Sequence, residues 1–213
     1  MAPTSPGLLL VYIRIANLVF LTGVTRINKQ LFNLRGYLDS SDTLHQLDSK
    51  LDFCKIPAFL RVLLTTDGTV TKSLESYFWE PIAIDKLNQQ QIKLQNTELL
   101  LGRKIGDVIL QRKIQLRGKH SGTIYAKATS LVSLDMLPAE ILSSVIDGST
   151  GIGELLRETG LETYREIIDF GVCQFENGPQ ENSTAIWRTY LIKKNQQPFI
   201  QVTETFPLKV FTN

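Results

Sequence analysis

Histidine is scarce in this sequence, and His45 and His120 are the only two among 213 residues. His120 lies in a predicted turn and His45 in a polar stretch, so we expect both rings to be solvated. A serine–histidine–acid triad therefore has few candidate bases. Cysteine is equally scarce, and neither Cys54 nor Cys173 has a neighbour at the spacing of a zinc site. The two could form a disulfide, but we favour two buried thiols in a reducing compartment.

Long apolar runs and an excess of one charge are also missing. Residues 8–24 are mostly apolar, but the stretch is shorter than the about 20 residues of a membrane helix, and Arg14 and Asn17 interrupt it. A secretory signal has a basic residue before its apolar core, and residues 1–7 contain none. We favour a buried or interfacial segment. The alternatives are a start codon placed too far upstream and a targeting or membrane role. The formal net charge is +2 and the basic residues are scattered, so nothing indicates binding to nucleic acid.

The segment Thr150-Gly151-Ile152-Gly153 contains two glycines but is not a phosphate-binding loop. It lacks the Lys-Ser/Thr pair of that motif, and no predicted parallel strand precedes it. Its composition is typical of a loop at the start of a helix. Backbone N–H groups at such a helix start can still bind a carboxylate.

Sequence periodicity predicts an α+β fold. Apolar residues at three- and four-residue spacing predict helices near 56–64, 70–78, 137–145 and 152–158. Alternation of apolar and polar residues predicts strands near 81–94, 107–118, 122–134, 163–176, 185–194 and 198–207. Turn sequences at 119–122, 177–180 and 195–197 make the strands that they join antiparallel neighbours. We therefore predict one six-stranded antiparallel sheet with helices packed on one face.

Two charged residues interrupt the apolar faces of these strands. Arg112 shares a face with Val108, Leu110, Ile114 and Leu116 in the segment VILQRKIQLR. In PFIQVTETFPL, Glu204 is the single charge among the residues of its face. A charge directed into a core is costly unless it is paired or binds a ligand. One interpretation is a structural salt bridge between the two. The other is a closed pocket in which Arg112 binds a carboxylate through two hydrogen bonds and Glu204 binds a hydroxyl or exchanges a proton.

Several segments of the chain resemble the chorismate pyruvate-lyases, most closely the cyanobacterial and plastid branch. They cover roughly residues 55–208 in the family's order and include the two charged positions described above. The segments are LRVLLTTDGTVTKSLESYFWEP (60–81), VILQRKIQL (108–116), GTIYAKATSLV (122–132), TGIGELL (150–156), TYREIIDFG (163–171), AIWRTYLI (185–192) and QVTETFP (201–207).

The resemblance implies a chorismate lyase-like fold in which flap loops close over a buried pocket. It implies conversion of chorismate to 4-hydroxybenzoate and pyruvate without a metal or organic cofactor, as a step toward plastoquinone. Carried over by position, Arg112 would bind the ring carboxylate and Glu204 the ring hydroxyl, both as catalytic residues. Val70 and Ile152 would contribute their backbones to substrate binding.

The resemblance also sets the expected domain organisation and partners. Residues 1–50 form an N-terminal segment outside it, and residues 51–213 form the lyase-like domain. We expect a monomer whose partners are the small molecules chorismate and 4-hydroxybenzoate, with no nucleic acid and no firm membrane association. The expected location is cytoplasmic, either a cyanobacterial cytosol or a plastid stroma. Alternatives are a non-catalytic module of the same fold that binds an aromatic acid, and an assembly protein that docks through its apolar N-terminus.

Overall fold

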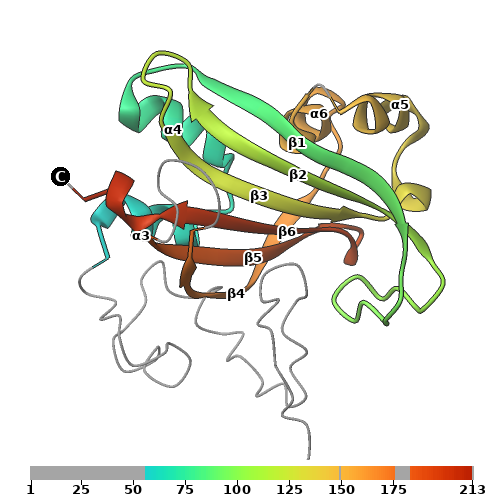
Figure 1. Cartoon of the computed structure of the whole chain (residues 1–213). Helices are drawn as coiled ribbons and strands as arrows, with labels where there is room; N and C mark the ends of the chain where they lie inside the picture. Colours follow the sequence, from blue (N-terminus) through green and yellow to red (C-terminus); the bar gives the residue numbers. More distant parts are fainter. Residues whose placement is uncertain (1–55, 149, 176–182, 213) are drawn as a thin grey trace, which may run out of the picture.

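Six strands form one antiparallel sheet in the order β1-β2-β3-β6-β5-β4 (Figure 1). The computed structural model describes residues 56–148, 150–175 and 183–212. The strands are β1 (Ile82–Lys93), β2 (Val108–Gly118), β3 (Ile124–Val132), β4 (Tyr164–Gln174), β5 (Thr184–Lys194) and β6 (Gln197–Pro207). All neighbours in the sheet are antiparallel. The predicted six-stranded antiparallel sheet is therefore confirmed, and the N-terminal segment 1–50 lies outside the described residues.

Four α-helices occur in the described part of the chain, and two pairs of them lie at opposite ends of the sheet (Figure 1). The first pair is α3 (Ala58–Thr65) and α4 (Val70–Phe78), and the second is α5 (Ala139–Asp147) and α6 (Ile152–Glu158). Short 3-10 helices occur at η2 (Leu134–Met136) and η3 (Leu208–Val210). None of the helices described here is long and apolar enough to cross a membrane.

Each helix pair covers its own hydrophobic cluster on the same face of the sheet. The α3–α4 cluster contains Leu60 and Leu74 together with Phe206 of β6. The α5–α6 cluster contains Ile141 together with Val202 of β6. We call this covered face the inner face. Ile114 of β2 contacts both clusters. A seam therefore crosses the middle of the inner face, between the two helix pairs.

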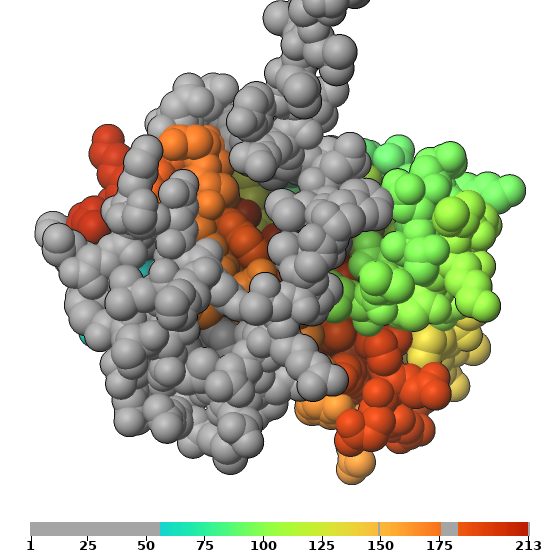
Figure 2. All heavy atoms as spheres, turned by 90° about the horizontal axis from the view of Figure 1, so that it is seen from below, coloured from blue at the N-terminus to red at the C-terminus, as the bar shows by residue number. Residues whose placement is uncertain are grey.

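Segments far apart in sequence form the two sides of the sheet. Seen from below (Figure 2), green residues of the first two strands lie at the right of the view, and orange to red residues of the C-terminal half lie at its left and beneath the green residues. Thr189 and Thr203 pair across β5 and β6 through their hydroxyl groups, 2.8 Å apart. Because these two positions alternate with inward-pointing residues, their pair stabilises the opposite face of the sheet.

A buried carboxylate joins β1 to the β2–β3 turn. Glu80 accepts hydrogen bonds from the backbone N–H groups of His120 and Ser121 and from the hydroxyls of Ser121 and Tyr125. These bonds, that of Tyr125 above all, lower the pKa of Glu80 to about 2. The carboxylate therefore stabilises the folded chain fully above its unfolded pKa, and this contribution is lost as the pH falls toward 2.

We expect Glu80→Gln to lower the free energy of unfolding at pH 7 and to change it little near pH 2. The amide cannot accept as many hydrogen bonds as the ionised carboxylate, but the protonated acid is similarly limited at low pH. Urea unfolding of both proteins at pH 7 and at pH 2.5 measures the difference. An equal loss of stability at both pH values would show that the charge of Glu80 does not contribute.

Candidate functional site

Arg112 of β2 is buried on the inner face, with 2% of its surface exposed. Its Nη2 donates to the carbonyl of Gly148 at 3.0 Å and its Nη1 to the carbonyl of Thr150 at 2.8 Å. Its Nε is buried and has no partner among the described residues. Burial lowers the pKa of Arg112, but an arginine stays charged in proteins. The guanidinium is thus a buried cation that no ion pair of the described residues includes.

The backbone that meets Arg112 requires glycine at position 148. Gly148 ends α5 in the left-handed conformation, with φ of 73°. A Cβ at this position would lie 2.5 Å from Oε1 of Gln89 on β1. Glycine fits both the conformation and the space. The turn brings the carbonyl of residue 148 to the guanidinium of Arg112 and directs the chain toward α6.

Glu204 of β6 is also buried, with 5% exposure. Its Oε2 accepts a hydrogen bond from Nε of Arg188 on β5 at 2.8 Å, and its Oε1 accepts one from the hydroxyl of Tyr190 at 3.2 Å. The guanidinium of Arg188 lies over the ring of Tyr190, 5.0 Å from its centroid. Burial and the adjacent charge of Glu204 raise the pKa of Tyr190, so the phenol remains a donor. A carboxylate can accept about four hydrogen bonds. Glu204 accepts two from Arg188 and Tyr190, so its carboxylate can accept further hydrogen bonds from a ligand.

Strand register places Arg112 and Glu204 on the same face without pairing them. Arg112 lies opposite Ser130 of β3, and Glu204 lies opposite Ala128 of the same strand. They are therefore separated by one strand and by two residues along it. The salt bridge weighed from the sequence does not form, because Glu204 pairs with Arg188 and Arg112 with backbone carbonyls. The side chain of Ala128 is small, so it occupies little of the volume between the two charged residues.

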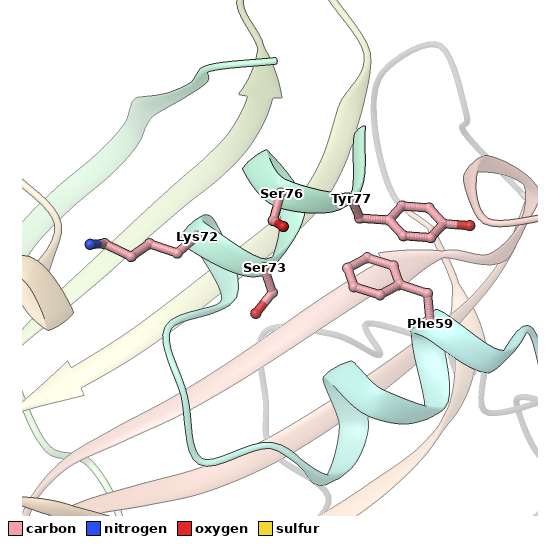
Figure 3. Close-up of a pocket in the computed structure, with 5 residues that line it drawn as sticks. All are labelled: Phe59, Lys72, Ser73, Ser76 and Tyr77. Carbon is pink, nitrogen blue, oxygen red and sulfur yellow. The ribbon is translucent and has the colours of Figure 1, made fainter. Parts of the chain in front are cut away.

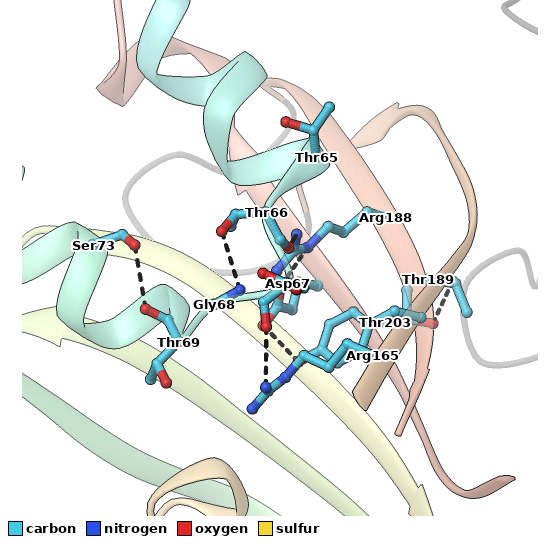
Figure 4. Close-up of polar contacts among 12 residues, drawn as sticks. Thr65, Thr66, Asp67, Gly68, Thr69, Ser73, Arg165, Arg188, Thr189 and Thr203 are labelled. Atoms are coloured by element: carbon cyan, nitrogen blue, oxygen red, sulfur yellow. Dashed lines mark hydrogen bonds and ion pairs between the residues drawn. The ribbon is translucent and has the colours of Figure 1, made fainter. Parts of the chain in front are cut away.

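The loop between α3 and α4 is held over the sheet by two arginines (Figure 4). Nη1 of Arg188 donates to the carbonyl of Thr66 at 2.7 Å. Nη1 of Arg165, on β4, donates to the carbonyl of Asp67 at 3.0 Å. Val70 begins α4 directly after this loop and is buried in the cluster of α3 and α4. The same arginine that pairs with Glu204 thus also holds the loop that leads into α4.

Ile152 begins α6 on the other side of the seam. It is buried in the cluster of α5 and α6. Two residues before it, the carbonyl of Thr150 meets Arg112. N–H groups in the first turn of a helix have no acceptor within the helix. Val70 and Ile152 therefore both carry such N–H groups, on two segments that converge on the inner face from opposite helix pairs.

Comparison with known sequences identifies the family. Residues 64–212 match the family described as Chorismate pyruvate-lyase Rv2949c-like. The chorismate pyruvate-lyase of Mycobacterium leprae (strain TN) is 33% identical over 179 residues, which cover 76% of this chain and 80% of that protein. The chain belongs to the Rv2949c-like chorismate pyruvate-lyase family. The matched region of this family contains Val70, Arg112, Ile152, Arg188 and Glu204.

A second relative of the chain agrees with that assignment. The chorismate pyruvate-lyase of Mycobacterium tuberculosis (strain CDC 1551 / Oshkosh) is 28% identical over 167 residues, covering 74% of this chain and 83% of that protein. Among solved structures, PhnF from Mycobacterium smegmatis superposes with a TM-score of 0.53 at 14% identity, covering 69% of this chain and 67% of that one. At that identity the superposition shows the fold alone, and it confirms the predicted fold class.

A surface hollow of about 570 Å³ lies apart from these residues, between α3 and α4 (Figure 3). It is lined by Phe59, Lys72, Ser73, Ser76 and Tyr77. The rings of Phe59 and Tyr77 stack with centroids 3.9 Å apart. None of the residues predicted to bind substrate lines this hollow, so the candidate site on the inner face is distinct from it.

Arg188 is the residue that the sequence reasoning missed. It is fully buried and is the direct partner of Glu204. The signal was present, because Arg188 is the single charge among the alternate positions from 186 to 192, where its neighbours are Ile186, Tyr190 and Ile192. The rule that selected Arg112 and Glu204 would have selected Arg188 as well. Arg165 gave no such signal, because a bulge between Ile167 and Asp169 breaks the alternation of β4.

Proposed function

We propose that this protein eliminates pyruvate from chorismate to give 4-hydroxybenzoate. The observation that carries the proposal is a buried cation and a buried carboxylate, Arg112 and Glu204, on one sheet face at the seam between two helix pairs. Strand spacing and rise separate their Cα atoms by about 12 Å. In this proposal the aromatic ring of the substrate lies between the two side chains. The family membership supports the same reaction.

In this proposal Arg112 binds the ring carboxylate. Its unpartnered Nε shows that the hydrogen-bonding capacity of the guanidinium is not exhausted by the two carbonyls. A charge-assisted hydrogen bond in a buried site is stronger than one in water. The N–H groups at the start of α6, including that of Ile152, would assist at the same carboxylate. The backbone of Val70 would contact the other end of the ring.

Glu204 in this proposal accepts a hydrogen bond from the ring hydroxyl and assists proton movement. In the reaction the ether bond between ring and enolpyruvyl group breaks, and the proton on the hydroxyl-bearing carbon leaves. The ring becomes aromatic, and enolpyruvate takes up a proton to become pyruvate. Aromatisation drives the elimination, so orientation and electrostatic stabilisation carry most of the catalysis. Burial of the planar product between the two charges would make product release slow.

Purified protein mixed with chorismate should release pyruvate and 4-hydroxybenzoate in equal amounts without added metal or nucleotide. A coupled assay for pyruvate and chromatography of the aromatic product measure both. A control reaction without protein measures the spontaneous breakdown of chorismate. If no pyruvate above this control appears while 4-hydroxybenzoate still binds, the protein is the non-catalytic binding module of the same fold.

The proposal extends to the fate of the product and the origin of the chain. We propose that 4-hydroxybenzoate enters quinone synthesis, toward plastoquinone if the chain belongs to the cyanobacterial and plastid branch. The resemblance of the segments within residues 55–208 to that branch supports this part of the proposal. Labelled 4-hydroxybenzoate fed to the source cells should appear in their plastoquinone, and the protein would act in the cytosol or stroma as a monomer.

A further inference from the structure

One donor of Arg188 has no partner. Arg188 is fully buried, its Nε donates to Glu204 and its Nη1 donates to the carbonyl of Thr66. Its Nη2 is buried and makes no hydrogen bond to any of the residues that the structure describes. A buried donor of a charged group that lacks an acceptor costs more free energy than a missing neutral hydrogen bond. An acceptor from outside the described residues is therefore expected at this nitrogen.

The geometry of the guanidinium places that acceptor beside Glu204. The group is planar, and Nε and Nη2 donate from one of its edges. Nε already meets Oε2 of Glu204 on that edge. An atom bound at Nη2 therefore lies next to the carboxylate of Glu204. The adjacent donor and acceptor match a group that can accept one hydrogen bond and donate another.

We propose that Arg188 contacts the substrate at its hydroxyl end, where Nη2 donates to the ring hydroxyl oxygen while that hydroxyl donates to Glu204. This assignment rests on the proposed function and adds a third charged residue to the site. It also gives the site its specificity, because a hydroxyl oxygen both donates and accepts. An aromatic amine donates equally well but accepts poorly, since its lone pair is delocalised into the ring.

Binding of three para-substituted acids tests the assignment without depending on turnover. The acids are 4-hydroxybenzoate, 4-aminobenzoate and benzoate, titrated into the unaltered protein and into Arg188→Met by calorimetry. The unaltered protein should bind the hydroxy acid about tenfold more tightly than the amino acid, since one charge-assisted hydrogen bond differs. In Arg188→Met this ratio should fall to about one, because both substituents then only donate to Glu204.

A matched control is Arg117→Met. Arg117 lies on β2, on the opposite face, and forms its own ion pair with Asp85 at 2.7 Å. This variant loses an arginine–carboxylate pair but should keep the ratio of the unaltered protein. If Arg188→Met instead weakens all three acids by the same factor, Arg188 has only a structural role and the proposal is wrong.

Arg188→Met leaves Glu204 without its cation and can fail to fold. In that case a crystal structure of the unaltered protein with 4-hydroxybenzoate decides the question. The hydroxyl oxygen should lie within about 3.2 Å of Nη2, and a longer separation would overturn the assignment. If the unaltered protein binds the three acids with equal affinity, the proposed role of Arg188 is rejected and the proposed function is not. Failure of all three acids to bind would reject the proposed function together with it.

Discussion

Arg112→Ala should abolish turnover of chorismate, with kcat/KM lower by about a thousandfold or more. Two charge-assisted hydrogen bonds to a buried carboxylate are each worth about 1.5–3 kcal/mol, and tenfold in affinity corresponds to about 1.4 kcal/mol. The loss should appear in the binding of substrate and product as well as in kcat/KM, because the carboxylate is present in substrate, transition state and product alike. Titration with 4-hydroxybenzoate should therefore show a loss of about two orders of magnitude or more.

Two further variants separate this role from a structural one. Arg112→Lys keeps the charge but loses the planar fork, so it should recover only part of the affinity. Arg117→Ala removes an arginine from the opposite face of the same strand and should leave kcat/KM near that of the unaltered protein. Since Arg112 also holds the carbonyls of Gly148 and Thr150, urea unfolding should accompany each assay. Folded Arg112→Ala protein with normal affinity for 4-hydroxybenzoate would contradict the proposed site.

The sheet could be predicted closely because its signals are local. Alternating residues define which positions of β2 and β6 point inward, and short turns define which strands are neighbours. The predicted helix near 152–158 and the strand near 107–118 agree with α6 and β2 to within one residue. At the ends of strands the alternation is a weaker guide. Val108, predicted on the apolar face, is 54% exposed because β2 begins there.

The partners of the buried charges could not be predicted, because they depend on contacts between distant parts of the chain. Arg112 meets the carbonyls of Gly148 and Thr150, and a backbone carbonyl has no sequence signature. Glu204 faces Arg188 because β5 and β6 pair in one particular register. Alternation alone says that both point inward, but it cannot distinguish Arg112 from Arg188 as the partner of Glu204. Only the register and the sheet order decide between them.

Glu204→Gln should lower kcat for chorismate by about a hundredfold or more while changing the affinity for 4-hydroxybenzoate much less. Proton transfer by a positioned side chain contributes about 10²–10⁴ to a rate, and an amide cannot take up the proton. The amide still accepts a hydrogen bond from the ring hydroxyl, so binding should persist within about tenfold of the unaltered protein. Steady-state kinetics and calorimetric titration of the same preparations give the two quantities.

The control for Glu204→Gln must account for Arg188, which loses its carboxylate partner in this variant. An unpaired buried cation destabilises a fold by about 3–5 kcal/mol, so a folding defect alone could lower the apparent rate. Tyr190→Phe removes the other hydrogen bond to Glu204 but keeps the carboxylate and its ion pair. That variant should retain most of the turnover. Equal losses of kcat and of product affinity in Glu204→Gln would instead mean that Glu204 only orients the ring, because a group needed solely for proton movement leaves ground-state binding intact.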